Sequence, residues 1–217
     1  MVSMQQERAR NEPFGYVCRA CSRCCAHKVI QVNPYEIARL ARRTEQTTSA
    51  FRDNCTEMSG AVLKRTPDDV CIFLGAEGCS VHPDRPLVCR LYPLGRRAAP
   101  DGTEVWLRAK PHPDSEGEYT ITGTIGDFIE AQGALPFMQA ADDYAQWVRK
   151  AGALIDASAD ATNDDPIPND LLDMDSVIAA YCAETDVAEP SDIEDRRKLH
   201  MIVLYRQLDR IEGGSDD

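Results

Sequence analysis

Apolar positions recur with a helical period near the start of the chain. Residues 34–43 read PYEIARLARR, and Asn33 followed by Pro34 supplies the residue types preferred at a helix N-cap and first helical position. The apolar side chains of this segment fall at i, i+3 and i+4, so one packed face is expected on Ile37, Leu40 and Ala41. A second short helix is expected over about residues 48–55.

The second half of the chain carries longer helical patterns. A helical section is expected over residues 127–149, with Gly133 and Pro136 dividing it. The helices expected after that break cover residues 137–155, 174–185 and 191–212. The last of them has an apolar stripe, typical of a core or docking face, on Met201, Leu204, Tyr205, Leu208 and Ile211.

Short stretches with β-like composition lie in the first two thirds of the chain, at residues 28–32, 103–109 and 118–124. The turn-rich residues 111–118 separate the last two, which are therefore expected to pair as a small β-hairpin. These patterns together predict an α+β fold that is mostly helical, with the helices concentrated in the C-terminal part.

Charge is distributed unevenly along the chain. Residues 1–151 carry 19 acidic and 19 basic side chains, whereas residues 152–217 carry 17 acidic and 5 basic ones. Because phosphate binding needs a basic surface, nucleic acid is not expected as a partner. The acidic C-terminal helices are expected either to solvate the protein or to bind another protein.

Membrane and export signals are not found in the sequence. No run of about 18 apolar residues occurs, and residues 1–17 contain no apolar segment of the kind found in secretory signals. A cytoplasmic protein without membrane association is therefore expected. Since that compartment keeps thiols reduced, the nine cysteines are expected to serve metal binding or redox chemistry and not structural disulfides.

The first cysteine block is a C-x2-C-x2-C-C run made of Cys18, Cys21, Cys24 and Cys25. Two-residue gaps let sulfur atoms converge on one side of a tight loop, as in zinc and iron–sulfur sites. Successive two-residue gaps resemble the ferredoxin-type run, in which one loop supplies three ligands and a fourth comes from elsewhere. This spacing favours an iron–sulfur cluster, such as a 4Fe–4S cluster, over zinc.

The second cysteine block supplies the distant ligands, Cys71, Cys79 and Cys89. Two histidines add candidate imidazole ligands: His82 in this block and His27 just after the first one. Seven clustered thiols exceed the need of one four-ligand site, so two sites and one site with spare thiols both agree with the sequence. The isolated Cys55 and Cys182 are expected to be small buried core residues.

A short helix is expected to begin after Asp84 or Arg85, with Pro86 near its first turn, and to end before Pro93, which would hold Cys89 on a rigid turn. Arg85 and Arg90 flank that cysteine. Beside a thiolate-rich centre, guanidinium groups lower the cost of burying negative charge and donate hydrogen bonds, although they could instead recognise an anionic substrate. Tyr92 is expected to pack around the site.

These motifs resemble a known family. The run CRACSRCC, then Cys71, then GCSVHPDRPLVCRLYP are similar to the CxxCxxCC (YkgJ-type) cysteine-cluster family, described as a zinc- or iron-chelating domain, over about residues 15–135. The seven clustered cysteines stand at that family's cysteine positions. Its RP-x2-CR-x-YP element is matched by Arg85, Pro86, Arg90, Tyr92 and Pro93. A more distant similarity links the cluster to flagellin lysine N-methylase.

The expected organisation is an irregular, metal-stapled N-terminal half followed by helices. Its segments are a flexible arm (1–14), a cysteine-cluster metal-binding domain (15–151), an acidic linker (152–170) and C-terminal helices (171–217). The expected function is metal binding, with iron–sulfur first and zinc second. Two alternatives stay open: an S-adenosylmethionine-using protein-modifying methylase, as the second resemblance implies, and a metal-stapled interaction module.

Overall fold

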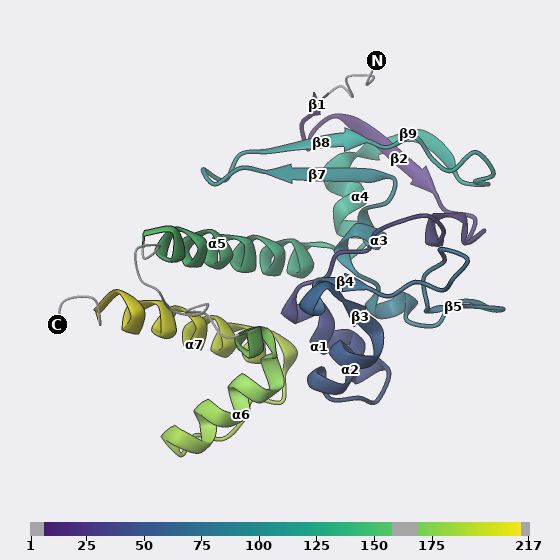
Figure 1. Cartoon of the computed structure of the whole chain (residues 1–217). Coiled ribbons are helices and arrows are strands. Elements are labelled where there is room, and N and C mark those ends of the chain that lie inside the picture. The colour runs from purple at the N-terminus through teal and green to yellow at the C-terminus, as the bar shows by residue number, and fades with distance from the viewer. Residues whose placement is uncertain (1–6, 158–168, 214–217) are drawn as a thin grey trace. The chain divides into compact units, whose positions relative to one another are not determined.

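The computed structural model describes residues 7–157 and 169–213 and divides into two compact units (Figure 1). The cysteine unit comprises Met1–Val32 and Cys55–Met138, and the helical unit comprises Asn33–Asn54 and Gln139–Asp217. The expected boundaries at residues 14, 151 and 170 follow the chain linearly, whereas each of these units is built from two separate segments. Each unit is described by itself below.

The strands of the cysteine unit form small antiparallel sheets. The largest has the order β1–β8–β7, and a second pairs β2 with β9. Their bounds are Glu7–Arg8 (β1), Pro13–Val17 (β2), Leu94–Ala98 (β7), Glu104–Arg108 (β8) and Glu118–Thr124 (β9). Residues 7–14 of the expected N-terminal arm thus include β1 and the start of β2.

The prediction that residues 103–109 and 118–124 pair as a hairpin is wrong. The segment 103–109 contains β8, which forms its hairpin with β7, and 118–124 is β9, which pairs with β2. The tip of the β7–β8 hairpin is Asp101-Gly102, with Gly102 at φ 83°, a strong turn signal. Alternation of side chains identifies strands without identifying their partners, so the pairing of β9 with the remote β2 had to come from the fold.

Shorter ladders organise the region of the cysteines. β3 (Thr56–Glu57) pairs with β4 (Val62–Leu63), and β5 (Leu74–Gly75) pairs with β6 (Gly78–Cys79). One-turn 3-10 helices cover Arg23–Cys25, Met58–Gly60 and His82–Asp84. The strand expected over residues 28–32 is reduced to one bridge, between Gln31 and Val62.

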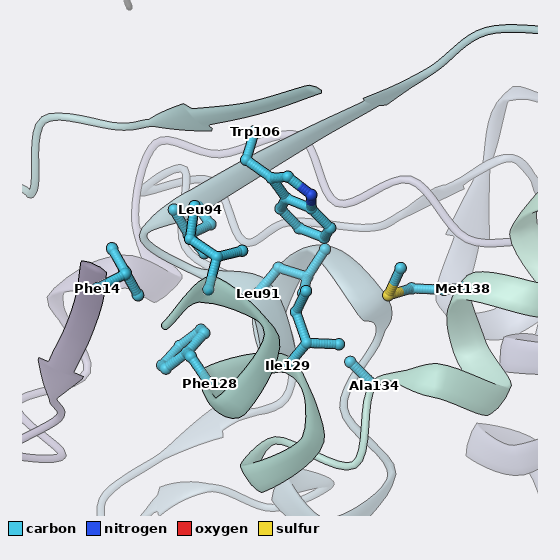
Figure 2. Close-up of a cluster of buried hydrophobic side chains, with 9 residues drawn as sticks. Phe14, Leu91, Leu94, Trp106, Phe128, Ile129, Ala134 and Met138 are labelled. Atoms are coloured by element: carbon cyan, nitrogen blue, oxygen red, sulfur yellow. The ribbon is translucent and has the colours of Figure 1, made fainter. Parts of the chain in front are cut away.

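A hydrophobic cluster forms the core of the cysteine unit (Figure 2). Trp106 points from β8 toward Leu91 of α3 (Leu87–Leu91) and Ile129 of α4 (Ile125–Ala131). Phe14 packs edge-to-face against Phe128, with ring centroids 5.0 Å apart. The remaining members are Leu94, Ile125, Ala134 and Met138. Because α3 is packed into this core through Leu91, its position and that of Cys89 are defined by apolar burial.

The helical unit contains α1 (Pro34–Arg43), α2 (Thr48–Cys55), most of α5 (Leu135–Ala157), α6 (Met174–Thr185), α7 (Ile193–Gly213) and the 3-10 turn Asn169–Leu172. The predicted start of α1 is confirmed: Asn33 caps the helix and forms a reciprocal capping box with Glu36. The expected break near residue 133 is also present, since α4 ends at Ala131. Pro136, however, lies in the first turn of α5 instead of interrupting it.

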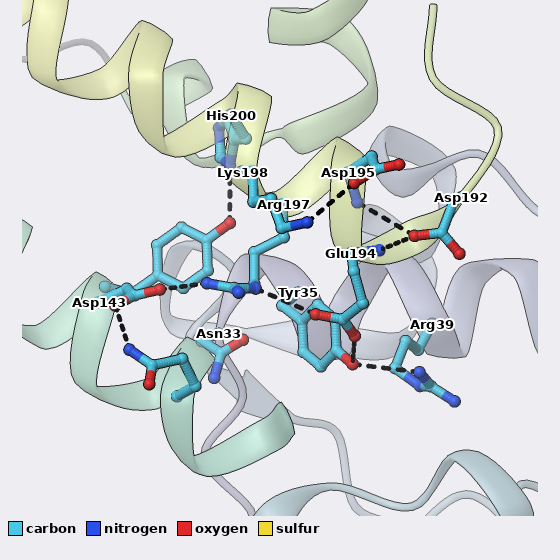
Figure 3. A network of polar contacts seen from close by, with 12 residues as sticks. Asn33, Tyr35, Arg39, Asp143, Asp192, Glu194, Asp195, Arg197, Lys198 and His200 are labelled. Carbon is cyan, nitrogen blue, oxygen red and sulfur yellow. Dashed lines mark hydrogen bonds and ion pairs between the residues drawn. The ribbon is translucent and has the colours of Figure 1, made fainter. Parts of the chain in front are cut away.

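Polar contacts fasten α7 to its neighbours in the helical unit (Figure 3). Arg197 pairs with Asp143 of α5, and Tyr35 of α1 donates a hydrogen bond to Glu194. His200 is fully buried, its Nδ1 lying 2.8 Å from the Tyr144 hydroxyl and its Nε2 2.8 Å from the Leu171 carbonyl oxygen. Buried polar groups with partners on both sides help to specify one packing of these helices.

The apolar stripe of α7 is mainly a core face, because Met201, Leu204 and Leu208 are buried. Cys55 and Cys182 are buried as predicted. Among residues 7–157 and 169–213, no helix combines the length and the apolar character needed to cross a membrane. The α+β, mostly helical class predicted from the sequence is confirmed. Of the predicted acidic linker, residues 158–168 lie outside the described part of the chain.

Candidate metal centre

The first cysteine block forms an irregular loop that turns sharply. Ala20, Ser22 and His27 adopt left-handed backbone conformations, with φ between 54° and 59°. Between them the amide of Cys25 donates to the carbonyl of Ser22 at 3.0 Å, closing the one-turn helix Arg23–Cys25. Repeated reversals of this kind bring sulfur atoms spaced two residues apart toward one side of the chain.

Backbone hydrogen bonds join this loop to the second block. The Cys71 amide donates to the Cys25 carbonyl at 2.9 Å, and the His27 amide donates to the Asp69 carbonyl at 2.8 Å. A bridge between Ala26 and Val70 lies between these bonds. The two cysteine blocks, which are remote in sequence, therefore meet as a short antiparallel ladder.

The β5–β6 hairpin carries the chain from Cys71 to Cys79. The Leu74 amide donates to the Cys71 carbonyl at 3.0 Å, and Leu74 pairs with Cys79 in the ladder. The turn closes at Gly78, whose φ of 97° suits glycine. This tight reversal explains how two cysteines eight residues apart reach the same region.

The third distant cysteine, Cys89, lies on α3, as the expected short helix required. Three residues later, the Tyr92 ring is contacted by the Lys28 ammonium group, whose nitrogen lies 3.3 Å from the ring centroid. The Tyr92 hydroxyl accepts a hydrogen bond from the His112 amide at 3.1 Å. Lys28 follows the first cysteine block, so this contact links the ends of both blocks.

Electrostatic interactions show which thiols gather. A hydrogen bond from the Cys25 thiol lowers the pKa of Cys24 to about 6, with the positive charges of Lys28 and Arg85 contributing. The pKa of Cys25 is raised by the same hydrogen bond and by burial, with Cys24, Cys71 and Cys79 adding repulsion. Cys25 thus interacts with three other thiols.

Lys28 extends this group to Cys89. Burial lowers the pKa of Lys28, and the thiolates of Cys24, Cys89 and Cys25 oppose that effect by favouring its charged form. Burial also raises the pKa of Cys71. The arrangement is a half-buried patch of thiols with positive charge beside it, which is the environment that favours reactive or metal-binding thiolates.

Arg85 and Arg90 are both held by the segment that follows α4. Arg85 donates to the Gln132 side-chain oxygen at 2.8 Å and to the His82 carbonyl at 2.9 Å. Arg90 is buried, donates to the backbone carbonyls of Gln132 and Pro83, and lies 4.0 Å from the Phe137 ring centroid. Arg85 is therefore the arginine whose charge reaches the thiols, and Arg90 is held by backbone and aromatic contacts.

The two histidines lie in different surroundings. Burial, then the charges of Arg85 and Arg90, lower the pKa of His82, and the Arg85 guanidinium lies 3.4 Å from its Nδ1. His27 is exposed and contacts Asp69, with Nδ1 3.0 Å from the carboxylate oxygen.

Cys18 and Cys21 interact with other groups than the thiols around Cys25. Cys18 is exposed, and its sulfur accepts from the Ala20 amide at 3.4 Å. Backbone hydrogen bonds at Arg23 and Glu116 lower the pKa of Cys21, and the Ser115 hydroxyl also bonds to it. These contacts place Cys21 against the loop that follows β8.

No group of three or more cysteine, histidine, aspartate or glutamate side chains in the described ranges, 7–157 and 169–213, is already arranged so that it could hold a metal ion. None of the nine cysteines, all of which lie in these ranges, forms a disulfide. The donor set itself is suitable, because soft thiolates are preferred by zinc and by iron–sulfur clusters. The segments are thus gathered, and the sulfurs must turn toward one another to coordinate one centre.

Sequence reasoning did not identify Lys28, Ser115 or His112 as parts of this region. Lys28 lies only four residues from Cys24, so its charge near the block was an available signal. The loop carrying His112 and Ser115 had no signal, because it reaches the site through the pairing of β9 with β2.

Comparison with known proteins identifies the cysteine region. Residues 17–109 match the family model "CxxCxxCC: Putative zinc- or iron-chelating domain". The match includes all seven clustered cysteines. No curated protein and no solved structure shows a significant match to the chain.

Proposed function

We propose that this protein holds an iron–sulfur cluster on its clustered cysteines, because residues 17–109 match the family model of a zinc- or iron-chelating domain. The proposed ligands come from the interacting thiols Cys24, Cys25, Cys71, Cys79 and Cys89, with His82 as a further candidate. Cys18 and Cys21 are the donors available to a second centre or to a larger one. A zinc ion is the alternative occupant of the same thiols.

The observation that carries this proposal is the interaction of Cys25 with three other thiols from two blocks of the sequence. Such thiols repel one another when ionised, and a cation or a cluster with iron ions removes that repulsion. The hydrogen bond from Cys25 and the nearby positive charges lower the pKa of Cys24, which favours the thiolate form that binds metals.

The protein supplies a scaffold for the ligands and compensating charge. Cys25 and Cys71 are joined by a backbone hydrogen bond, Cys79 is placed by the β5–β6 hairpin, and Cys89 is held by α3. Lys28 and Arg85 lower the cost of gathering thiolates. When bound, an iron–sulfur cluster would supply one-electron redox chemistry, whereas zinc would cross-link the segments.

The test is elemental analysis together with an ultraviolet–visible spectrum of protein purified without oxygen. Iron with acid-labile sulfide and broad absorption near roughly 400 nm is the expected result for a thiolate-bound cluster. Stoichiometric zinc in a colourless sample would mean that zinc, and not a cluster, occupies these thiols. Protein that binds neither metal, even after reconstitution with iron and sulfide or with zinc, would overturn the proposal.

Variants connect the metal to these residues. Cys24→Ser is expected to lower metal content and to destabilise residues 15–95, because the ligand segments have little apolar surface of their own. Cys182→Ala is the matched control, since Cys182 is a free thiol in the helical unit and is expected to leave metal content unchanged. Unchanged metal content and unchanged melting in Cys24→Ser would contradict the assignment.

A further inference from the structure

The contact between Lys28 and Tyr92 is unusual in its position. Lys28 follows Cys24 and Cys25 by a few residues, and Tyr92 follows Cys89 by three. The ammonium nitrogen lies 3.3 Å from the ring centroid, well within cation–π range. One side-chain contact therefore joins the segment after the first cysteine block to the segment after the second.

Both partners are held by other groups. Tyr92 receives a hydrogen bond from the His112 amide and packs edge-to-face on Tyr16, with centroids 6.2 Å apart. On the other side, the residue before Lys28 is anchored because the His27 amide donates to the Asp69 carbonyl. A lysine ordinarily keeps its ammonium group in water, so a half-buried position between a fixed ring and thiols needs a reason.

We propose that Lys28 is a positioning residue of the metal centre: held on the face of Tyr92, it ties the two cysteine segments together and presents a positive charge to their thiolates. This inference rests on the proposed function for its effect on metal retention. The tie between the segments is a property of the chain alone. The charge acts at Cys24, Cys25 and Cys89, which are the thiols that interact with Lys28.

Lys28 and Tyr92 make two contributions that variants can separate: the contact that ties the segments together and the positive charge beside the thiols. Tyr92 provides a π face, and its hydroxyl accepts from His112, so Tyr92→Phe keeps the face and loses one hydrogen bond. Lys28→Arg keeps both the charge and the ability to stack, whereas Lys28→Met keeps the length of the side chain and removes the charge. Lys110→Met is the control, since Lys110 is an exposed lysine of the same unit.

The first measurement is hydrogen exchange by mass spectrometry on the full chain, as purified and after chelator treatment. Lys28→Met is expected to speed exchange in residues 87–94, and Tyr92→Leu is expected to speed it in residues 23–28. Lys28→Arg, Tyr92→Phe and Lys110→Met should match the wild type. The exchange is measured in the segment that does not carry the substitution. A purely local disturbance at the substituted residue would therefore not produce this pattern.

The second measurement is the rate of metal loss to a chelator. Lys28→Met is expected to lose metal roughly tenfold faster than the wild type, the scale of one partly desolvated cation–π contact. Lys28→Arg and Lys110→Met should lose it at the wild-type rate. The inference would be overturned if Lys28→Met exchanged hydrogen and lost metal at the same rates as Lys110→Met.

The two proposals fail in different ways. If the wild-type protein binds no metal, the proposed function fails, and the exchange experiment still tests the tie between the segments. If the wild type binds metal and Lys28→Met keeps normal exchange and normal retention, only the role of Lys28 fails.

Discussion

The amide of Cys71 donates a hydrogen bond of 2.9 Å to the carbonyl oxygen of Cys25. These two residues belong to different cysteine blocks, and their backbones are paired independently of any sulfur contact. The side chains of a ladder lie at defined spacings, so this pairing limits where the thiols of both blocks can reach. The consequences can be tested at the turn, at the core, at an arginine and at a buried histidine.

The turn of the β5–β6 hairpin tests how backbone geometry positions Cys79. Gly78→Ala is expected to cost about 1–3 kcal/mol and to lower the metal content, because alanine is strained at a φ of 97°. Gly75→Ala is the matched control: its added Cβ would meet an atom at 3.8 Å, close to the 3.9 Å at Gly78, but its φ is not positive. Urea unfolding and metal analysis measure both effects. Equal behaviour of the two variants would show that the turn does not place Cys79.

The core position of Phe14 tests whether the N-terminal segment is part of the folded unit. Phe14→Ala is expected to lower the free energy of unfolding by about 3–5 kcal/mol, since a buried ring packed on Phe128 is lost. Val17→Ala, on the same strand but 42% exposed, should cost less than about 1 kcal/mol. Denaturant melts decide between these values. A loss at Phe14 as small as that at Val17 would mean that residues 7–14 behave as an arm.

Arg90 separates a structural role from recognition of an anionic substrate. Arg90→Lys is expected to destabilise the cysteine unit by roughly 2 kcal/mol, because lysine cannot serve the Gln132 and Pro83 carbonyls and stack on Phe137 at once. Arg97→Lys, with a side chain 68% exposed, is the control and should be nearly neutral. Thermal melting of both variants provides the comparison. Wild-type stability in Arg90→Lys would favour the recognition role.

His200 predicts a pH dependence of the helical unit. Burial lowers its pKa to about 4 from the ordinary 6.5, so the unfolded chain takes up a proton at a higher pH than the folded one does. The contribution of His200 to the free energy of unfolding should therefore be constant above about pH 6.5, fall by roughly 3 kcal/mol between pH 6.5 and pH 4, and level off below. The charged groups that act on His200 are Asp173 and Asp175, which raise its pKa, and Arg196, which lowers it.

His200→Gln isolates this contribution. Glutamine has no titrating proton and can still donate to the Leu171 carbonyl. Urea unfolding across the same pH range should show a shallower decline in the variant than in the wild type. Identical pH profiles for the two proteins would rule out His200 as the titrating group.

Local patterns were sufficient for much of the fold. The capping pair at the start of α1, the helix that carries Cys89 and the burial of Cys55 and Cys182 all follow from short-range signals. Helix caps and apolar stripes depend on residues a few positions apart, so their physics is contained in a short window. Strand partners can lie in remote segments, and the pairing of β9 with β2 could not be obtained from alternation alone.

The sequence by itself determined the chemical character of the candidate site: thiols at two-residue spacings, with distant cysteines to complete a donor set, belong to metal chemistry whatever the fold. Only the tertiary structure decided that Cys25 interacts with Cys71 and Cys79, that Lys28 lies on Tyr92, and that Cys21 interacts with Ser115. The reason is physical. Ligand type is a property of each side chain, whereas proximity and charge environment arise only when remote segments are packed together.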